Sequence, residues 1–149
     1  MEVIQVRESK KRFLSLLLLG DEQESMIDRY LENGEMFVLF SSNNQAIAEA
    51  VVADNGDGIF EIKNFAVDPA FQRHGYGRYL INYLFTHYQG RAKKLIVGTG
   101  ETAATMNFYL ACGFCYSHRI ENFFTDHYDH QIVEEGHVLK DIVYFSRPL

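Results

Sequence analysis

The chain has 149 residues, 47% hydrophobic and 23% charged, so we expect one ordinary globular domain spanning residues 1–149. Its 20 acidic and 14 basic residues give a net charge of −6, which argues against a protein that binds nucleic-acid phosphates. Residues 121–149 carry a charge of −4 and the first 120 residues only −2, so the acidic surplus lies near the C-terminus.

The N-terminal segment alternates apolar and polar residues over positions 1–7, which predicts a strand. Two helices are predicted next, at about 9–19 and 22–32. Residues 10–19 place basic residues before an apolar run, as a signal peptide does, but the run is too short to span a membrane. Acidic residues follow Gly20 in place of a cleavage site. We therefore interpret the run as a buried helix of a cytoplasmic protein and expect no membrane role.

The rest of the chain alternates predicted strands and helices. Residues 54–58 form an asparagine- and glycine-rich hairpin turn, which makes the strand after it antiparallel to the strand before it. A short apolar strand after the first long helix predicts a parallel crossover unit. The class is therefore a mixed α/β or α+β single domain. The predicted strands are 36–40, 45–53, 59–67, 95–97, 114–120 and 138–146, and the predicted helices are 75–88 and 102–112, the latter ended by Gly113.

Cys112 and Cys115 have the C-x-x-C spacing of a redox or metal half-site. A structural zinc site takes about four ligands, and the sequence has no second pair to complete one. We interpret both cysteines as reduced thiols in a reducing compartment. The loop at 126–130 contains two histidines and two aspartates, which we interpret as solvated polar residues, and we expect no metal.

The segment Gln72-Arg73-His74-Gly75-Tyr76-Gly77 follows a strand and opens a helix. The free amides and the dipole of a helix N-terminus favour an anion such as a phosphate group. The alternative is a helix that needs glycine only for close packing. A dinucleotide motif is excluded because position 80 is leucine, and a P-loop is excluded because Arg78 follows Gly77.

Two motifs together resemble the GNAT superfamily of N-acetyltransferases. The Q-x-x-G-x-G turn follows a strand that ends at residues 66–69, and Tyr109 precedes the pair Gly113-Phe114 by four residues. The resemblance covers residues 35–120. It implies a mostly antiparallel sheet of six to seven strands, flanked by helices, with one splayed parallel pair.

The resemblance also implies acetyl-CoA as co-substrate. The backbone of Phe65, Ala66 and Val67 would contact the pantetheine arm and the acetyl carbonyl, where an amide acts as an oxyanion donor. Thr102 occupies a position where the family often has asparagine, and Thr105 one where it often has alanine, so the pantetheine contact of Thr102 is open. The pyrophosphate cradle would be Gln72, Arg73, His74, Gly75, Tyr76, Gly77 and Arg78.

By the same resemblance, Tyr109 is the general acid that protonates the departing thiolate, a role that a tyrosine with a pKa near 10 can perform. The alternative is an aromatic core residue. Glu61 aligns with a strand glutamate that is the general base in some members. Its alternatives are a solvated strand-edge glutamate and a water chain in place of a protein base.

The aromatic segment at 120–128 follows the last predicted helix and strand, where the family places acceptor-side elements. Phe123, Phe124, His127 and Tyr128 could form a substrate wall, and the alternatives are a loop packed on the core or a dimer contact. The resulting hypothesis is direct transfer of acetyl from acetyl-CoA to a primary amine, of a cationic small molecule or a peptide, in a ternary complex. A non-catalytic acyl-CoA-binding module and an aromatic interaction protein are the alternatives, and a homodimer is a further candidate state.

Overall fold

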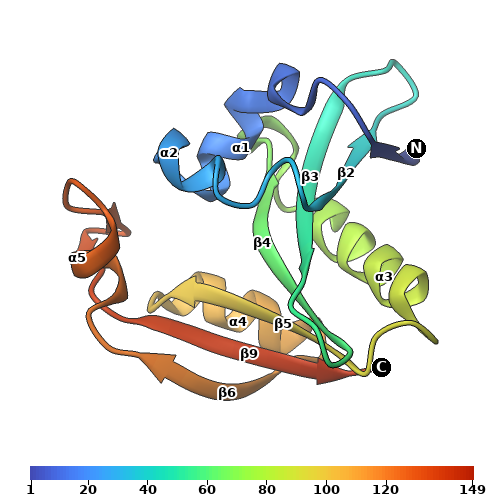
Figure 1. Cartoon of the computed structure of the whole chain (residues 1–149). Helices are drawn as coiled ribbons and strands as arrows, with labels where there is room; N and C mark the ends of the chain where they lie inside the picture. Colours follow the sequence, from blue (N-terminus) through green and yellow to red (C-terminus); the bar gives the residue numbers. More distant parts are fainter.

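The computed structural model describes residues 1–149 and is organised around a seven-stranded sheet of order β1-β2-β3-β4-β5-β9-β6 (Figure 1). All neighbouring strands are antiparallel except β4 and β5, which are parallel. The predicted mixed sheet with one parallel pair is therefore confirmed. The strands are β1 (Glu2–Val6), β2 (Glu35–Phe40), β3 (Ala46–Asp54), β4 (Ile59–Val67), β5 (Lys94–Gly100), β6 (Cys115–Ile120) and β9 (Ile142–Pro148).

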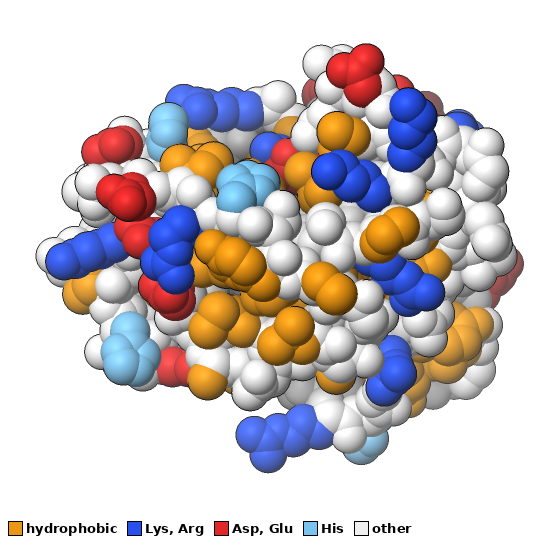
Figure 2. Space-filling model, turned by 90° about the horizontal axis from the view of Figure 1, so that it is seen from below, with side chains coloured by type: hydrophobic (Ala, Val, Ile, Leu, Met, Phe, Trp, Pro, Cys, Tyr) orange, Lys and Arg blue, Asp and Glu red, His pale blue; other side chains and the backbone are white.

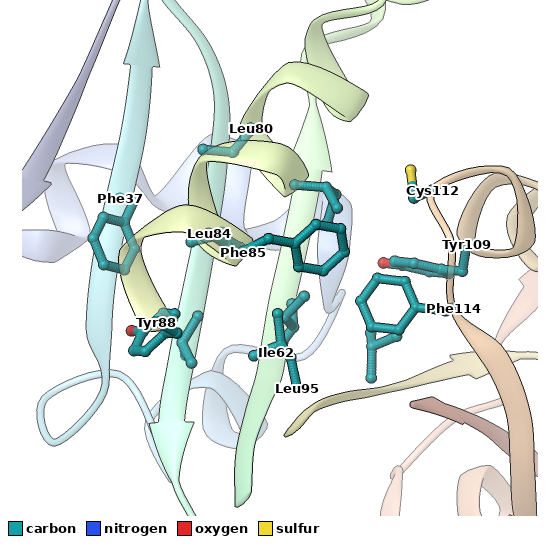
Figure 3. Packing of buried hydrophobic residues seen from close by; sticks show 14 of the residues in the cluster. Phe37, Ile62, Leu80, Leu84, Phe85, Tyr88, Leu95, Tyr109, Cys112 and Phe114 are labelled. Atoms are coloured by element: carbon teal, nitrogen blue, oxygen red, sulfur yellow. The ribbon is translucent and has the colours of Figure 1, made fainter. Parts of the chain in front are cut away.

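Helices cover both faces of the sheet. On one face, α3 (Tyr76–Tyr88) and α4 (Ala103–Ala111) bury the larger apolar cluster, in which Tyr109 and Phe114 lie side by side near Phe85 (Figure 3). On the other face, α1 (Leu14–Gly20) and α2 (Glu24–Ile27) bury a smaller cluster. Short 3₁₀ turns precede α1 (η1, Lys10–Phe13) and α3 (η2, Pro69–Phe71).

The parallel pair separates partway along its length. Pairing of β4 with β5 ends at Ile62 and Val97, although both strands continue beyond that point. In Figure 1, β2, β3 and β4 run steeply while β5, β9 and β6 run across, and the two groups meet near the C-terminus. The predicted splayed strand pair is therefore present.

A bulge in β4 lies just beyond the last paired residues. On the β3 side, Ile62 pairs with Val52 and Asn64 with Val51, so Lys63 has no partner. The extra residue reverses the alternation of side chains along the strand. Ile62 therefore packs in the cluster under α3 and α4, whereas Asn64 faces α1 and donates to the carbonyl of Leu17 at 2.9 Å.

The helix predicted over 22–32 is too long, because α2 spans only Glu24–Ile27 and turns follow it. The buried Lys10 ammonium donates to the carbonyls of Leu31, Glu32 and Gly34 at 2.9, 3.2 and 2.7 Å. Carbonyls at the end of a helical or turn segment have no amide partner within it, so the Lys10 ammonium satisfies these three and joins η1 to the residues that precede β2.

The C-terminal part contains elements that the sequence pattern did not indicate. These are α5 (Phe123–His127) and a small hairpin of β7 (Val133–Glu134) and β8 (His137–Val138). The last strand, β9, begins four residues later than predicted and inserts between β5 and β6. Both cysteines are unpaired, Cys112 buried and Cys115 exposed.

The strand β6 is an exposed edge of the sheet, and Leu110 of α4 and Tyr116 and Ile120 of β6 are exposed apolar residues. Figure 2, the view from the lower side of Figure 1, shows apolar side chains grouped in the middle of one face with charged side chains around them. The other edge of the sheet is β1, and the homodimer stays a prediction. None of the helices has the length and apolarity needed to cross a membrane.

Candidate active site

A cavity of about 400 Å³ lies where β4 and β5 separate. Its wall combines the second halves of these two strands with α4, α5, β9 and the connection between α1 and α2. The volume is that of an ordinary small-molecule site. The separated strands therefore form a built cavity rather than a gap filled by side chains.

The cavity passes through the sheet. Tyr144 and Phe145 are neighbours on β9 and point to opposite faces, as successive strand residues do. Tyr109 packs against Phe145 with ring centroids 6.4 Å apart, whereas Glu61 accepts a hydrogen bond from Tyr144. Tyr109 and Glu61 thus lie on opposite faces, yet both line this one cavity. Groups held on the two faces can meet only in the opening between the strands.

Tyr109 projects from α4 and is buried, packed against Phe65, Phe114 and Phe145. Its hydroxyl points away from α4 toward α3 and β4 in Figure 3. Burial raises the pKa of this hydroxyl, with smaller contributions from Cys112 and Glu49. The group therefore holds its proton throughout the neutral range, and its role as the acid stays a prediction.

Glu61 lies on β4 two positions before the bulge and is almost fully buried. Asn55 donates to one carboxylate oxygen at 2.9 Å, and Tyr144 donates to the other at 3.1 Å. The Lys63 ammonium lies 3.4 Å from the second oxygen. The sequence left open that Glu61 is a solvated glutamate at a strand edge. Its burial and its hydrogen bonds exclude that alternative.

The glycine-rich turn forms the N-terminus of α3, as predicted, and Gly75 is the N-cap with φ of +81°. A Cβ at Gly75 would meet nothing within 4 Å, so the backbone is open to a ligand. At Gly77 a Cβ would lie 3.2 Å from Phe108 and 3.3 Å from Val67, so Gly77 serves the packing of α3. Four polar side chains are exposed around this N-terminus: Gln72, Arg73, His74 and Arg78. Tyr76 is half-buried.

The backbone from Phe65 to Val67 pairs with β3 on one side and lies beyond the last β5 pair on the other. This edge has no strand partner, and the Val67 carbonyl accepts from Gln72 at 3.1 Å, so the pantetheine contact stays a prediction. Thr102 lies outside the cavity. It is buried at the start of α4, bonds Thr105 and lines a second cavity of about 340 Å³, whereas Thr105 lines the first.

The cavity is lined by all four residues predicted for the acceptor side: Phe123, Phe124, His127 and Tyr128. The first three belong to α5 (Phe123–His127), and Tyr128 follows it directly. Tyr128 donates to Asp21 at 2.7 Å. His130 bridges Glu22 and Asp129. These bonds join the α5 segment to the α1–α2 connection, so the aromatic wall is fixed across the mouth of the cavity.

Several residues of the site were missed by the sequence reasoning. Four of them line the cavity: Asp21, Arg29, Lys63 and Tyr144. The fifth, Asn55, donates a hydrogen bond to Glu61. Lys63 and Asn55 lie close to Glu61 in sequence, on the same strand and in the preceding turn, whereas Asp21, Arg29 and Tyr144 reach the cavity only through packing between distant segments. The alternation in β9 could have placed Tyr144 on one face, but no signal in the sequence assigns that strand between β5 and β6.

The fold, the open helix N-terminus and the cavity between the separated strands agree with the family that the two sequence motifs resemble. Residues 32–115, more than half of the chain, match the model of the acetyltransferase (GNAT) domain. The chain therefore belongs to the GNAT family of N-acetyltransferases, which the sequence motifs predicted. Acetyl-CoA is its co-substrate and supplies the activated acetyl group.

Individual relatives agree with this assignment. The chain is 30% identical over 142 residues to the uncharacterized N-acetyltransferase YvbK of Bacillus subtilis strain 168, covering 91% of this chain and 88% of that protein. It is 30% identical to a GNAT family acetyltransferase from Elizabethkingia anophelis with acetyl-CoA bound, with TM-score 0.93, covering 99% and 97% of the two chains. A Bacillus subtilis acetyltransferase in complex with CoA is 27% identical, with TM-score 0.89 and coverage of 99% and 98%.

Proposed function

We propose that this acetyltransferase moves the acetyl group directly to a primary amine within one ternary complex, with Tyr109 as general acid and Glu61 as general base. One observation carries the proposal: the two side chains line the same cavity from opposite faces of the sheet. Acetyl-CoA approaching along α3 and α4 reaches Tyr109, and an amine on the α1 side reaches Glu61. The reactants then meet without a covalent enzyme intermediate, and their alignment supplies much of the rate.

In this scheme Glu61 takes a proton from the attacking ammonium, and the neutral nitrogen forms a bond to the acetyl carbon. A free backbone amide of the segment Phe65 to Val67 stabilises the charge on the carbonyl oxygen. The carbon–sulfur bond then breaks, and Tyr109 gives its proton to the leaving thiolate. The nitrogen loses its second proton as the amide forms, which restores the proton of Tyr109, and Glu61 passes the first proton to water.

Titration calorimetry with acetyl-CoA, followed by a CoA-release assay over a panel of amines, tests this function. We expect micromolar binding and release of CoA with at least one primary amine. The panel should contain polyamines, aminoglycosides, amino acids and peptides with free N-termini. Absence of binding at high micromolar acetyl-CoA contradicts the proposal. Binding without CoA release for any amine supports the non-catalytic module instead.

We further propose that the acceptor is cationic, a small molecule or a peptide. Four carboxylates, Asp21, Glu22, Glu61 and Glu134, line the cavity, against Arg29 and Lys63. Only Glu134 comes from the acidic segment 121–149, so most of the charge at the mouth comes from elements earlier in the chain. Burial, with Glu22 and Glu135 nearby, raises the pKa of Glu134, and an adjacent ammonium would relieve this unfavourable field.

We expect the KM for the preferred amine to rise several-fold between about 0.02 M and about 0.5 M salt, because screening weakens attraction between charges. The variant Glu134→Gln should raise KM at low salt and reduce this dependence. Glu8→Gln is the matched control, since Glu8 is an exposed glutamate that lines neither cavity, so the variant changes the net charge equally without changing the field at the site. An anionic acceptor, or equal effects of the two variants, contradicts the cationic assignment.

A further inference from the structure

The carboxylate of Glu61 is held by side chains from three separate elements. Asn55 donates from the β3–β4 turn to one oxygen, and Tyr144 donates from β9 to the other. Lys63 lies 3.4 Å from the latter oxygen and also faces the ring of Tyr30, 5.8 Å away. A glutamate side chain is flexible when free, so these partners restrict it to one orientation toward the cavity.

Tyr144 is itself fixed on both sides of its ring. His118 of β6 stacks on it with ring centroids 4.8 Å apart and planes 2° from parallel. Gly98 of β5 is its direct cross-strand partner, and a Cβ at Gly98 would approach the Tyr144 ring to 2.9 Å. Burial and the nearby Glu61 raise the pKa of Tyr144, so the hydroxyl remains a donor at neutral pH.

Gly98 lies one position beyond Val97, the last β5 residue that pairs with β4. Its missing side chain leaves the space in which the Tyr144 ring lies close to the β5 backbone. The strand separation that opens the cavity and the contact that holds Glu61 therefore occur at the same place. His118, Gly98 and Tyr144 come from three adjacent strands, and together they direct one hydroxyl to one carboxylate oxygen.

We propose that Tyr144 is a positioning residue for Glu61, holding the carboxylate in the orientation from which it accepts the proton of the acceptor amine. The inference rests on the proposed role of Glu61 as general base. Removing the hydroxyl leaves Asn55 on one oxygen and only the longer Lys63 contact on the other. The carboxylate then samples orientations that do not face the amine, which lowers the rate of the chemical step more than it weakens substrate binding.

The test compares Tyr144→Phe with wild type and repeats the comparison in a Glu61→Gln background. We expect Tyr144→Phe to lower kcat about tenfold, with KM and acetyl-CoA affinity changed less than about twofold. In the Glu61→Gln background the same substitution should cause no further loss, because the group it orients is gone. Gly98→Ala keeps the hydroxyl but places a Cβ 2.6 Å from Ile142 and 2.9 Å from the Tyr144 ring, and by displacing the ring it should reproduce the loss of kcat.

Tyr116→Phe is the matched control, since Tyr116 lies on the exposed edge strand β6 outside the cavity, and its kcat should equal that of wild type. Wild-type kcat in Tyr144→Phe overturns the inference. An equal loss in both backgrounds also overturns it, because Tyr144 then acts independently of Glu61. If wild type binds acetyl-CoA but releases no CoA with any amine, the proposed function fails first and the role of Tyr144 fails with it.

Discussion

Replacing Tyr109 with phenylalanine is expected to lower turnover by about 100-fold or more while leaving the affinity for acetyl-CoA nearly unchanged. The substitution removes only the hydroxyl and keeps the ring that packs against Phe65, Phe114 and Phe145. Without the acid, the thiolate must leave unprotonated or take its proton from water. The cost therefore falls on the chemical step and not on binding.

The measurements are kcat by CoA release and the dissociation constant by titration calorimetry, with thermal unfolding to confirm the fold. Tyr83→Phe is a suitable control, because Tyr83 is a half-buried tyrosine that packs on Phe37 and His87 and does not line the cavity. Unchanged turnover in Tyr109→Phe would remove Tyr109 as the acid and leave it as an aromatic core residue.

Replacing Glu49 with leucine is expected to raise the unfolding temperature at pH 8. Glu49 lies in the middle of β3 with no exposed surface, and neither carboxylate oxygen has a hydrogen-bond partner. Burying an unsatisfied polar group costs roughly 1–3 kcal/mol. For a domain of this size each kcal/mol corresponds to about 2–4 °C in the unfolding temperature.

The pH dependence of stability distinguishes the charge of Glu49 from its polarity. Desolvation by burial raises the pKa of Glu49 well above its usual value, so the folded state keeps a proton that the unfolded state releases above about pH 4.5. The free energy of unfolding of wild type should therefore fall as pH rises from about 4.5 to the folded pKa, by up to about 1.4 kcal/mol per pH unit.

Glu49→Gln keeps the size and polarity but cannot ionise, so it should lose this pH dependence while gaining less stability than Glu49→Leu. Denaturant unfolding at pH 5 and pH 8 measures both effects. A stability difference between wild type and Glu49→Gln that is the same at the two pH values would show that Glu49 does not carry the predicted proton.

The strand and helix pattern of the middle of the chain could be predicted because its signals are local. The strand at 59–67 has the predicted bounds. The helix predicted over 75–88 spans Tyr76–Tyr88, with Gly75 as its N-cap. Both motifs that indicated the family are contiguous in sequence, and each is complete within one strand-turn-helix or helix-turn segment. The helix at 22–32 was predicted too long, because the structure replaces its second half with hydrogen-bonded turns after Ile27.

The proposed acid–base pair also shows which features are local in sequence and which depend on the fold. Tyr109 and Glu61 were assigned from their places in the motifs, and the sequence alone left both the base role of Glu61 and its solvated alternative open. Burial and the bonds from Asn55 and Tyr144 decide that Glu61 is held in place. The reversal of alternation at Lys63 could not be read from the sequence, because a bulge is defined only against its partner strand.

By itself the sequence determined the family, the co-substrate and the residues of the two motifs, because short-range backbone preferences and spacing suffice for them. Only the tertiary structure decided the cavity and its charge, since its wall joins segments as distant as Asp21 and Tyr128, 107 positions apart. It also decided that Thr105, and not Thr102, faces the cavity. Contacts of this kind arise from strand order and packing, which depend on the whole chain and leave no periodic signal in any one segment.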